Sequence, residues 1–326
     1  MTDDEDVLTG ISRRYQRFAD KEARGRSPLY EQCARAIATD PAMLTFLATL
    51  PEPKRQPNLL FAAARWLAGI PGTYSTVRAV VLEQGAALTE LMLTRRTQTN
   101  EPARCATMLP VLAALPQPLA LLEVGASAGL TLLPDRYSYD YAGQTLTAPD
   151  PAAPVLRCQP RGPVPLPDEL PQVVWRAGID LNPLDVTDAD DVAWLRCLIW
   201  PGEPDRQERL DAAIAIARRD PPHIIRGDLV DDLPALAAQA PSHATLVVFH
   251  SAVLVYISPS RRREFAAAVG DLHAIWLSNE GPGVLADLTN EPTPRPGTDP
   301  FILARDGRTA LALTDGHGTW IEWISA

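Results

Sequence analysis

Residues 119–130 read Leu-Ala-Leu-Leu-Glu-Val-Gly-Ala-Ser-Ala-Gly-Leu. The apolar half, which ends at Glu123 and Val124, is typical of a buried strand. The small residues Gly125, Ala126, Ser127, Ala128 and Gly129, here called the glycine loop, let the backbone bend sharply and pass close to a ligand. We expect a helix to begin directly after this loop, so that free backbone N–H groups point toward a ligand at the strand end. The same five residues also match the G-x-S-x-G nucleophile elbow of α/β-hydrolases.

The glycine loop separates two different patterns along the chain. Before it, residues 1–117 follow a helical pattern without a clear strand, and Ser27-Pro28 is a good helix start. After it, strands, loops and helices alternate, which is typical of a parallel sheet covered on both faces. The predicted strands are residues 119–124, 173–179, 223–226, 245–250 and 274–278, followed by antiparallel hairpin strands at 301–305, 309–313 and 319–323.

The predicted fold class is therefore α/β, with a Rossmann-like, mostly parallel sheet that ends in antiparallel strands and follows an all-helical N-terminal region. We expect the helical region to cover residues 1–117 and the sheet domain residues 118–326. A Tyr- and Pro-rich insertion at about 134–172 is long enough to be a lid or binding loop. A second excursion, from 188 to 220, should form two helices that break at Trp200-Pro201-Gly202.

Composition limits the partners of this chain. Its 326 residues carry a formal charge of −10, which argues against nucleic acid as a partner because such binding depends on Lys and Arg at the phosphates. Four cysteines lie far apart, without the spacing of a zinc site or a disulfide framework. No apolar run is long enough for a membrane span, and the acidic first residues lack the basic start of a signal peptide. We expect a cytoplasmic protein with a small-molecule substrate, no membrane contact and no metal.

Polar residues stand at four predicted strand ends. Glu123 ends the first strand, Asp180 the second and His250 the fourth, while Asp228 follows the third. In an open α/β sheet, the carboxyl ends of parallel strands present such residues to a ligand. Their recurrence therefore predicts a binding site at this edge of the sheet.

This succession resembles the motifs of the class I S-adenosylmethionine-dependent methyltransferases. More narrowly, five stretches are similar to an uncharacterised bacterial family of unknown function that would span nearly the whole chain. These stretches are Ser27-Pro28-Leu29-Tyr30, Thr99-Asn100-Glu101, residues 121–133, Asp180-Leu181-Asn182-Pro183 and Phe249-His250-Ser251.

The broader resemblance implies S-adenosylmethionine as the cofactor. Glu123 would then lie beside its methionine part, and Gly125, Ala126, Ser127 and Gly129 would bring the backbone close to it. Asp180, followed by Leu181, would accept hydrogen bonds from the ribose hydroxyls. Asp228, with Leu229, would reach the adenine.

The methyl acceptor would meet the cofactor near His250, which is the candidate for acid/base catalysis because imidazole titrates near neutral pH. Further candidates to bind the acceptor are Asn100, Glu101, Arg104, Tyr139 and Glu280. The helical N-terminal region would form one wall of this site.

Two other functions stay open at this point. A serine hydrolase would use Ser127 as the nucleophile, with Asp228 and either His250 or His317. The long helical region before the first strand is unusual for that class. The third possibility is a protein that binds a nucleoside or a partner without catalysis, because a fold does not guarantee a function. We expect methyl transfer to a small-molecule acceptor, with a protein acceptor as the second choice.

Overall fold

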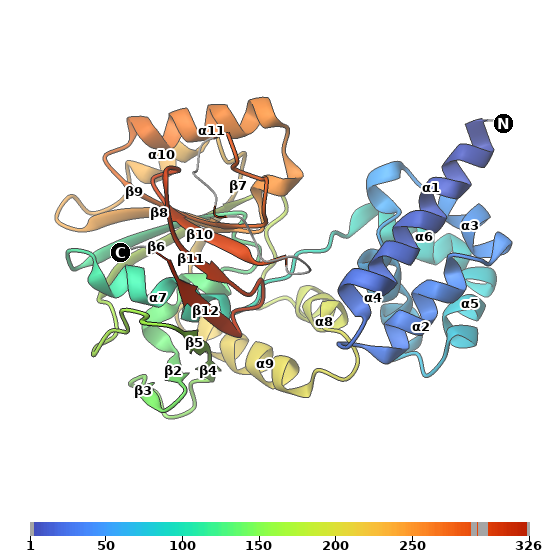
Figure 1. Ribbon diagram of the computed structural model, residues 1–326, viewed down its shortest axis with the longest axis horizontal. Helices are drawn as coiled ribbons and strands as arrows, with labels where there is room; N and C mark the ends of the chain where they lie inside the picture. Colours follow the sequence, from blue (N-terminus) through green and yellow to red (C-terminus); the bar gives the residue numbers. More distant parts are fainter. Residues whose placement is uncertain (1–2, 288–291, 293–298, 325–326) are drawn as a thin grey trace. The chain divides into compact units, whose positions relative to one another are not determined.

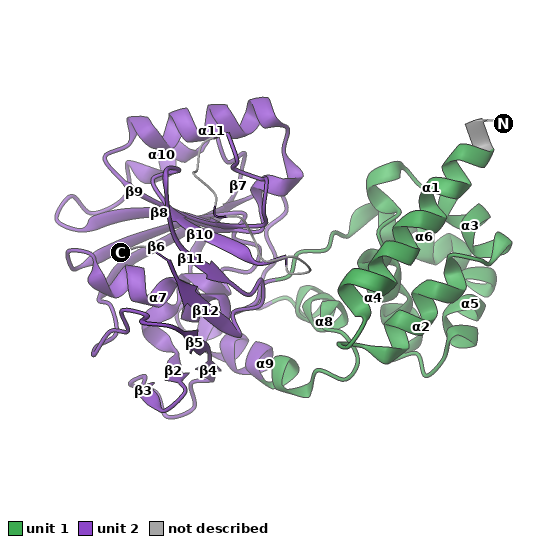
Figure 2. Cartoon of the chain, viewed as in Figure 1, with its two compact units in different colours: residues 1–99, 188–208 green, residues 100–187, 209–326 purple. Residues whose placement is uncertain are grey.

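The computed structural model describes residues 3–287, 292 and 299–324. The chain forms two compact units (Figure 2). Residues 1–99 and 188–208 make up the first, here called the helical unit, and residues 100–187 and 209–326 make up the second, here called the sheet unit. The division falls at residue 99 and not at 117 as predicted, because α7 (Arg104–Ala114) packs within the sheet unit and α8 (Ala189–Leu198) packs on α4 of the helical unit.

The helical unit is built from short helices. Ser27 caps α2 as predicted, since its side chain accepts a hydrogen bond from the Tyr30 amide. The helical pattern is interrupted at Gln84, which leaves the helical conformation, with φ −122° and ψ 25°, and separates two helices. The helices of this unit are α1 (Asp3–Phe18), α2 (Pro28–Ile37), α3 (Pro41–Ala48), α4 (Pro57–Ala68), α5 (Tyr74–Glu83), α6 (Gly85–Thr94) and α8. α9 (Pro204–Arg219) follows the break at Trp200-Pro201-Gly202, as predicted.

A mixed sheet dominates the sheet unit (Figure 1). Its order is β5-β12-β11-β10-β9-β8-β1-β6-β7. The pairs from β7 to β9 are parallel and those from β9 to β12 are antiparallel, which confirms the predicted fold class. The strands are β1 (Leu119–Val124), β5 (Gln159–Arg161), β6 (Val173–Asp180), β7 (His223–Arg226), β8 (Thr245–Ser251), β9 (Ile275–Glu280), β10 (Phe301–Arg305), β11 (Thr309–Thr314) and β12 (Trp320–Trp323).

The central strands follow the doubly wound order. In chain order, β1, β6 and β7 extend the sheet to one side, and β8 and β9 then extend it on the other side of β1. The topological switch point, where open α/β sheets bind their ligands, thus lies between β1 and β8. Alternation along each strand then decides which side chains face which layer.

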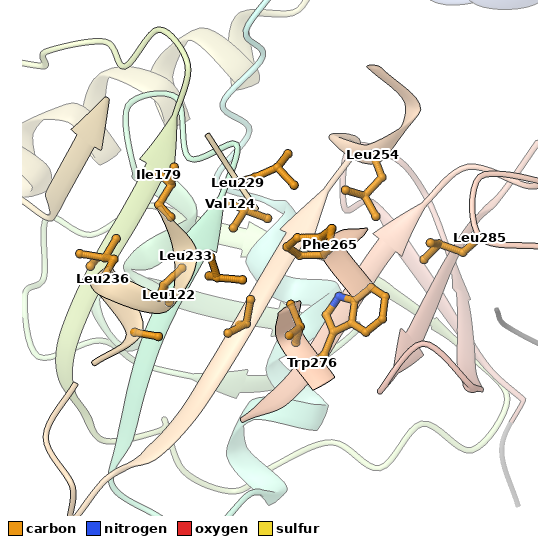
Figure 3. Packing of buried hydrophobic residues seen from close by; sticks show 14 residues of the cluster. Leu122, Val124, Ile179, Leu229, Leu233, Leu236, Leu254, Phe265, Trp276 and Leu285 are labelled. Atoms are coloured by element: carbon orange, nitrogen blue, oxygen red, sulfur yellow. The ribbon is translucent and has the colours of Figure 1, made fainter. Parts of the chain in front are cut away.

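One sheet face carries an apolar cluster (Figure 3). Leu122 and Val124 of β1 pack there with Phe265 of α11 (Pro259–Asp271) and Leu233 of α10 (Leu233–Ala237). Glu123 lies between Leu122 and Val124 in the strand, so its side chain points to the opposite face. Thr131 and α7 lie on that second face, because Thr131 binds Glu123 and Cys105 of α7 donates to the Thr131 carbonyl.

The helix expected after the glycine loop is absent from the described chain. Two three-residue 3₁₀ turns, η3 (Leu130–Leu132) and η4 (Pro134–Arg136), take its place. The physical reason is Pro134, because the residue before a proline avoids the α conformation, and Leu133 has φ −114° and ψ 37°. The chain then forms a small sheet of β2 (Ser138–Tyr141), β3 (Gln144–Leu146) and β4 (Val155–Arg157), and β5 pairs with β12.

No helix within the described ranges is long and apolar enough to cross a membrane.

Candidate functional site

Three carboxylates end three neighbouring parallel strands. Glu123 lies at the end of β1, Asp180 ends β6, and Asp228 follows β7 by two residues. Because β1, β6 and β7 are adjacent in the sheet, these residues share its carboxyl edge, as the sequence predicted. We call this edge, beside the switch point between β1 and β8, the acidic edge.

The glycine loop adopts the left-handed conformation at three positions. The φ angles of Gly125, Ser127 and Gly129 are 71°, 53° and 70°. A Cβ atom on Gly125 would lie 2.4 Å from Cγ2 of Val253, and one on Gly129 would lie 2.7 Å from Cδ1 of Ile224. Both glycines are therefore required by the backbone conformation and by close packing.

Side chains, and not a helix, hold the glycine loop in place. Asn100 Nδ2 donates to the Ala126 carbonyl at 3.3 Å, and Asn100 Oδ1 accepts from the Leu130 amide at 2.7 Å. Asp180 accepts from the Ser127 amide at 2.8 Å and from the Asn182 amide at 2.7 Å. Asn100 was predicted to bind the acceptor, but in the structure it holds both ends of this loop.

Glu123 is the most unusual ionisable group of the acidic edge. Its exposed fraction is 4%, and its Oε1 accepts a hydrogen bond from the Thr131 hydroxyl. Its Oε2 is buried without a hydrogen-bond partner among the described residues. Burial raises the pKa of Glu123 to about 8, although the Thr131 hydrogen bond and the charge of Arg104 act in the opposite direction. A buried carboxyl group with such a pKa is mostly protonated at neutral pH and can bind or release a proton near it.

Asp228 is ionised more readily than a free aspartate, and the two leucines that were predicted to bind the cofactor differ in burial. Partial burial alone would raise the pKa of Asp228, but hydrogen bonds from the amides of Val230 and Asp231 and the Arg261 guanidinium outweigh it and lower this pKa. Leu229 packs in the apolar cluster of Figure 3, so its predicted contact with a base does not fit the structure. Leu181, in contrast, is 57% exposed beside Asp180.

The predicted catalytic role of His250 does not fit its surroundings. The side chain is fully buried, with an exposed fraction of 0%. Nδ1 is 2.7 Å from Oε1 of Glu280, and Nε2 accepts from the indole N–H of Trp276 at 3.0 Å. With Trp276 donating to Nε2, the hydrogen must be on Nδ1, and both ring nitrogens are then used. His250 lies on the α11 face and stabilises the core.

Glu280 belongs to the same network. Besides His250, its Oε1 accepts from the amides of Val253 and Leu254 at 2.8 and 3.0 Å. Its exposed fraction is 2%. Through these hydrogen bonds Glu280 holds the segment that follows β8, and Val253 of this segment packs against Gly125. The prediction that Glu280 binds the acceptor is therefore replaced by a role in holding this segment.

Glu101 and Arg104 also hold the fold. Glu101 accepts from the Ala103 amide at 3.1 Å and pairs with Arg209 at 2.8 Å, at the beginning of α7. Arg104 donates to the carbonyls of Gly316 and Ser251 at 2.9 and 3.1 Å. Both side chains are almost completely buried. Glu101 therefore stabilises the beginning of α7, and Arg104 connects α7 to the end of β8 and to the turn between β11 and β12.

Tyr139 is not accessible to an acceptor. It is fully buried, its hydroxyl donates to the Pro134 carbonyl at 2.6 Å, and its ring stacks on Tyr141. The hydroxyls of Tyr137 and Tyr141 likewise bind the carbonyls of Leu130 and Ala106. The insertion therefore uses its tyrosines to pack the small sheet.

Sequence reasoning missed two buried polar residues, Thr131 and Thr314. The Thr131 hydroxyl donates to Glu123. The Thr314 hydroxyl donates to Asn279 Oδ1 at 2.8 Å, and Asn279 Nδ2 donates to the Ser251 hydroxyl at 3.3 Å. Ser251 and Asn279 follow predicted strand ends, and for this reason the sequence also made Asn279 a candidate to bind the acceptor. Thr131 gave no such signal, because only the 3₁₀ turn brings its hydroxyl back over β1.

The geometry does not favour the hydrolase alternative. Ser127 has the positive φ that a nucleophile elbow would show, but the 3₁₀ turn η3 follows it directly in place of the α-helix of such an elbow. His250 uses both ring nitrogens in the core, and Asp228 is paired with Arg261. No group of His, Cys, Asp and Glu side chains that could hold a metal ion occurs within the described residues.

The comparison with known protein families gave one result. Residues 12–323 match a family described as "Uncharacterized protein conserved in bacteria (DUF2332)". The chain belongs to this family. The match covers nearly the whole chain, as the narrower resemblance in the sequence indicated. No curated protein and no solved structure matched significantly.

Proposed function

We propose that this protein transfers a methyl group from S-adenosylmethionine to a small-molecule acceptor. The observation that carries the proposal is the acidic edge, where Glu123, Asp180 and Asp228 end three adjacent parallel strands beside the switch point and next to the glycine loop. Ligands of doubly wound sheets bind in this position, with an acidic residue after the second strand at the ribose.

The charges of the edge suit this cofactor, which carries a sulfonium and an ammonium group. The buried Oε2 of Glu123 has no partner in the described chain, and a buried polar atom of this kind calls for a hydrogen-bonding group or a charge. A cationic ligand group beside Glu123 would favour the ionised carboxylate. The residues present therefore fit the cofactor.

Each residue has a definite task in this proposal. Asp180 already accepts two amides, but each carboxylate oxygen can accept more than one hydrogen bond, so the ribose hydroxyls remain possible donors. Leu181 offers an exposed apolar side chain to the base. S-adenosylmethionine supplies an activated methyl group when bound. Glu123 holds a proton at neutral pH and releases it when a cation binds next to it.

Calorimetric titration with S-adenosylhomocysteine tests the proposal. We expect micromolar-range binding to the wild type and an at least tenfold weaker affinity for Asp180→Asn, since hydrogen bonds to a charged group contribute roughly 1.5–3 kcal/mol each. The exposed Asp271 gives the matched control, and Asp271→Asn should leave the affinity unchanged. Absence of binding to the folded wild type at millimolar ligand would refute the proposal.

A further inference from the structure

A cavity of about 300 Å³ lies beside the glycine loop. Four short segments of the sheet unit line it: the glycine loop, the loop after β6, the turn before β7, and β7 itself. The lining residues are Ala128, Pro183, Leu184, Asp185, Val186, Pro221, Pro222 and Ile224. Because Ile225 packs toward the apolar cluster, Ile224 and the cavity lie on the opposite face of the sheet.

The walls of this cavity are rigid. Three of the lining residues are prolines, whose backbone has little freedom. The loop after β6 is tied at two points, since the Leu184 amide donates to the Ser127 carbonyl at 3.1 Å and Arg218 Nε donates to the Val186 carbonyl at 2.6 Å. The cavity is thus formed before any ligand arrives, which lowers the entropic cost of binding.

The lining selects for one class of ligand. Seven of the eight lining residues carry apolar side chains and Asp185 is the charged exception, but polar atoms contribute slightly more of the exposed lining than apolar atoms do. The volume of this cavity lies at the lower end of the range for small-molecule sites, which suits a body of one or two rings, and the cavity is partly open to solvent. The carboxylate of Asp185 disfavours an anionic ligand.

The position of the cavity connects it to the acidic edge. Ala128 belongs to both the cavity wall and the glycine loop, and Pro183 follows Asp180 by three residues. We propose that this cavity binds the one- or two-ring body of a neutral or cationic methyl acceptor. The role of this ligand as a methyl acceptor rests on the proposed function, whereas its binding in the cavity does not require the cofactor.

Ligand-observed NMR with indole as the probe tests this inference without cofactor. We expect saturation transfer from the wild type to indole, and at least fivefold less transfer to the anion indole-3-carboxylate. Val186→Phe and Ile224→Phe fill the cavity from two different segments, and each should reduce indole binding at least fivefold. Val164→Phe makes the same type of change on the insertion and should leave it unchanged. Thermal unfolding identifies any variant that does not fold. If one cavity variant does not fold, indole binding to the other cavity variant tests the inference.

The outcomes separate this inference from the proposed function. Indole binding that is lost in the cavity variants supports the cavity site whether or not S-adenosylhomocysteine binds. Absence of indole binding to the wild type, or binding that both folded cavity variants retain, overturns the inference even if S-adenosylhomocysteine binds. Competition between indole and S-adenosylhomocysteine would also overturn it, because the cavity would then be part of the cofactor site.

Discussion

Glu123→Gln should change how stability depends on pH. In the folded chain, burial raises the pKa of Glu123 from the ordinary 4.5 to about 8. A raised folded-state pKa means that the folded chain holds a proton that the unfolded chain has lost. Glu123 therefore makes its full contribution to the free energy of unfolding below pH 4.5, and this contribution is lost progressively as the pH rises to about 8. One pKa unit corresponds to about 1.4 kcal/mol, so the loss amounts to about 5 kcal/mol.

Urea unfolding of the wild type and Glu123→Gln from pH 5 to 9 measures this effect. Glutamine keeps an oxygen that can accept from Thr131 but does not titrate. The unfolding free energy of the wild type minus that of Glu123→Gln should therefore fall by about 1.4 kcal/mol per pH unit and level off above pH 8. The exposed Glu90 on α6 provides the control, and the difference for Glu90→Gln should be flat. A flat difference for Glu123→Gln as well would show that the carboxyl group is not held protonated in the fold.

Four further outcomes follow from the same contacts. The affinity for S-adenosylhomocysteine should rise with pH, at most about tenfold per unit, until about pH 8 because its ammonium group needs ionised Glu123; titration of Glu123→Gln should give a constant affinity. Ser127→Ala should leave stability and turnover nearly unchanged, whereas labelling of Ser127 by a fluorophosphonate would favour the hydrolase. His250→Ala should cost about 3 kcal/mol in urea unfolding because it breaks a buried network, while His273→Ala, at an exposed position, should cost less than about 0.5 kcal/mol. A chain that begins at Pro118 should be insoluble in an expression test because it lacks the buried helix α7; a soluble product that binds the cofactor would contradict this.

The strands and their polar ends could be predicted from the sequence because both are local properties. A run such as residues 119–124 is apolar enough to be buried on both faces, and it ends where a glycine loop must turn. Alternation of such runs with helical segments favours a parallel sheet, and adjacent parallel strands bring their carboxyl ends together. Glu123, Asp180 and Asp228 could therefore be assigned to one edge without a structure.

Only the tertiary structure decided what these side chains contact. His250 and Glu123 both stand near strand ends, but alternation and neighbouring layers direct His250 into the α11 core and Glu123 toward Thr131 on the other face. The missing helix after the glycine loop makes Asn100, which is distant in sequence, the residue that holds the loop. The division of the chain at residue 99 also depends on packing, because α7 and α8 are both helical in sequence and differ only in the surface that buries them.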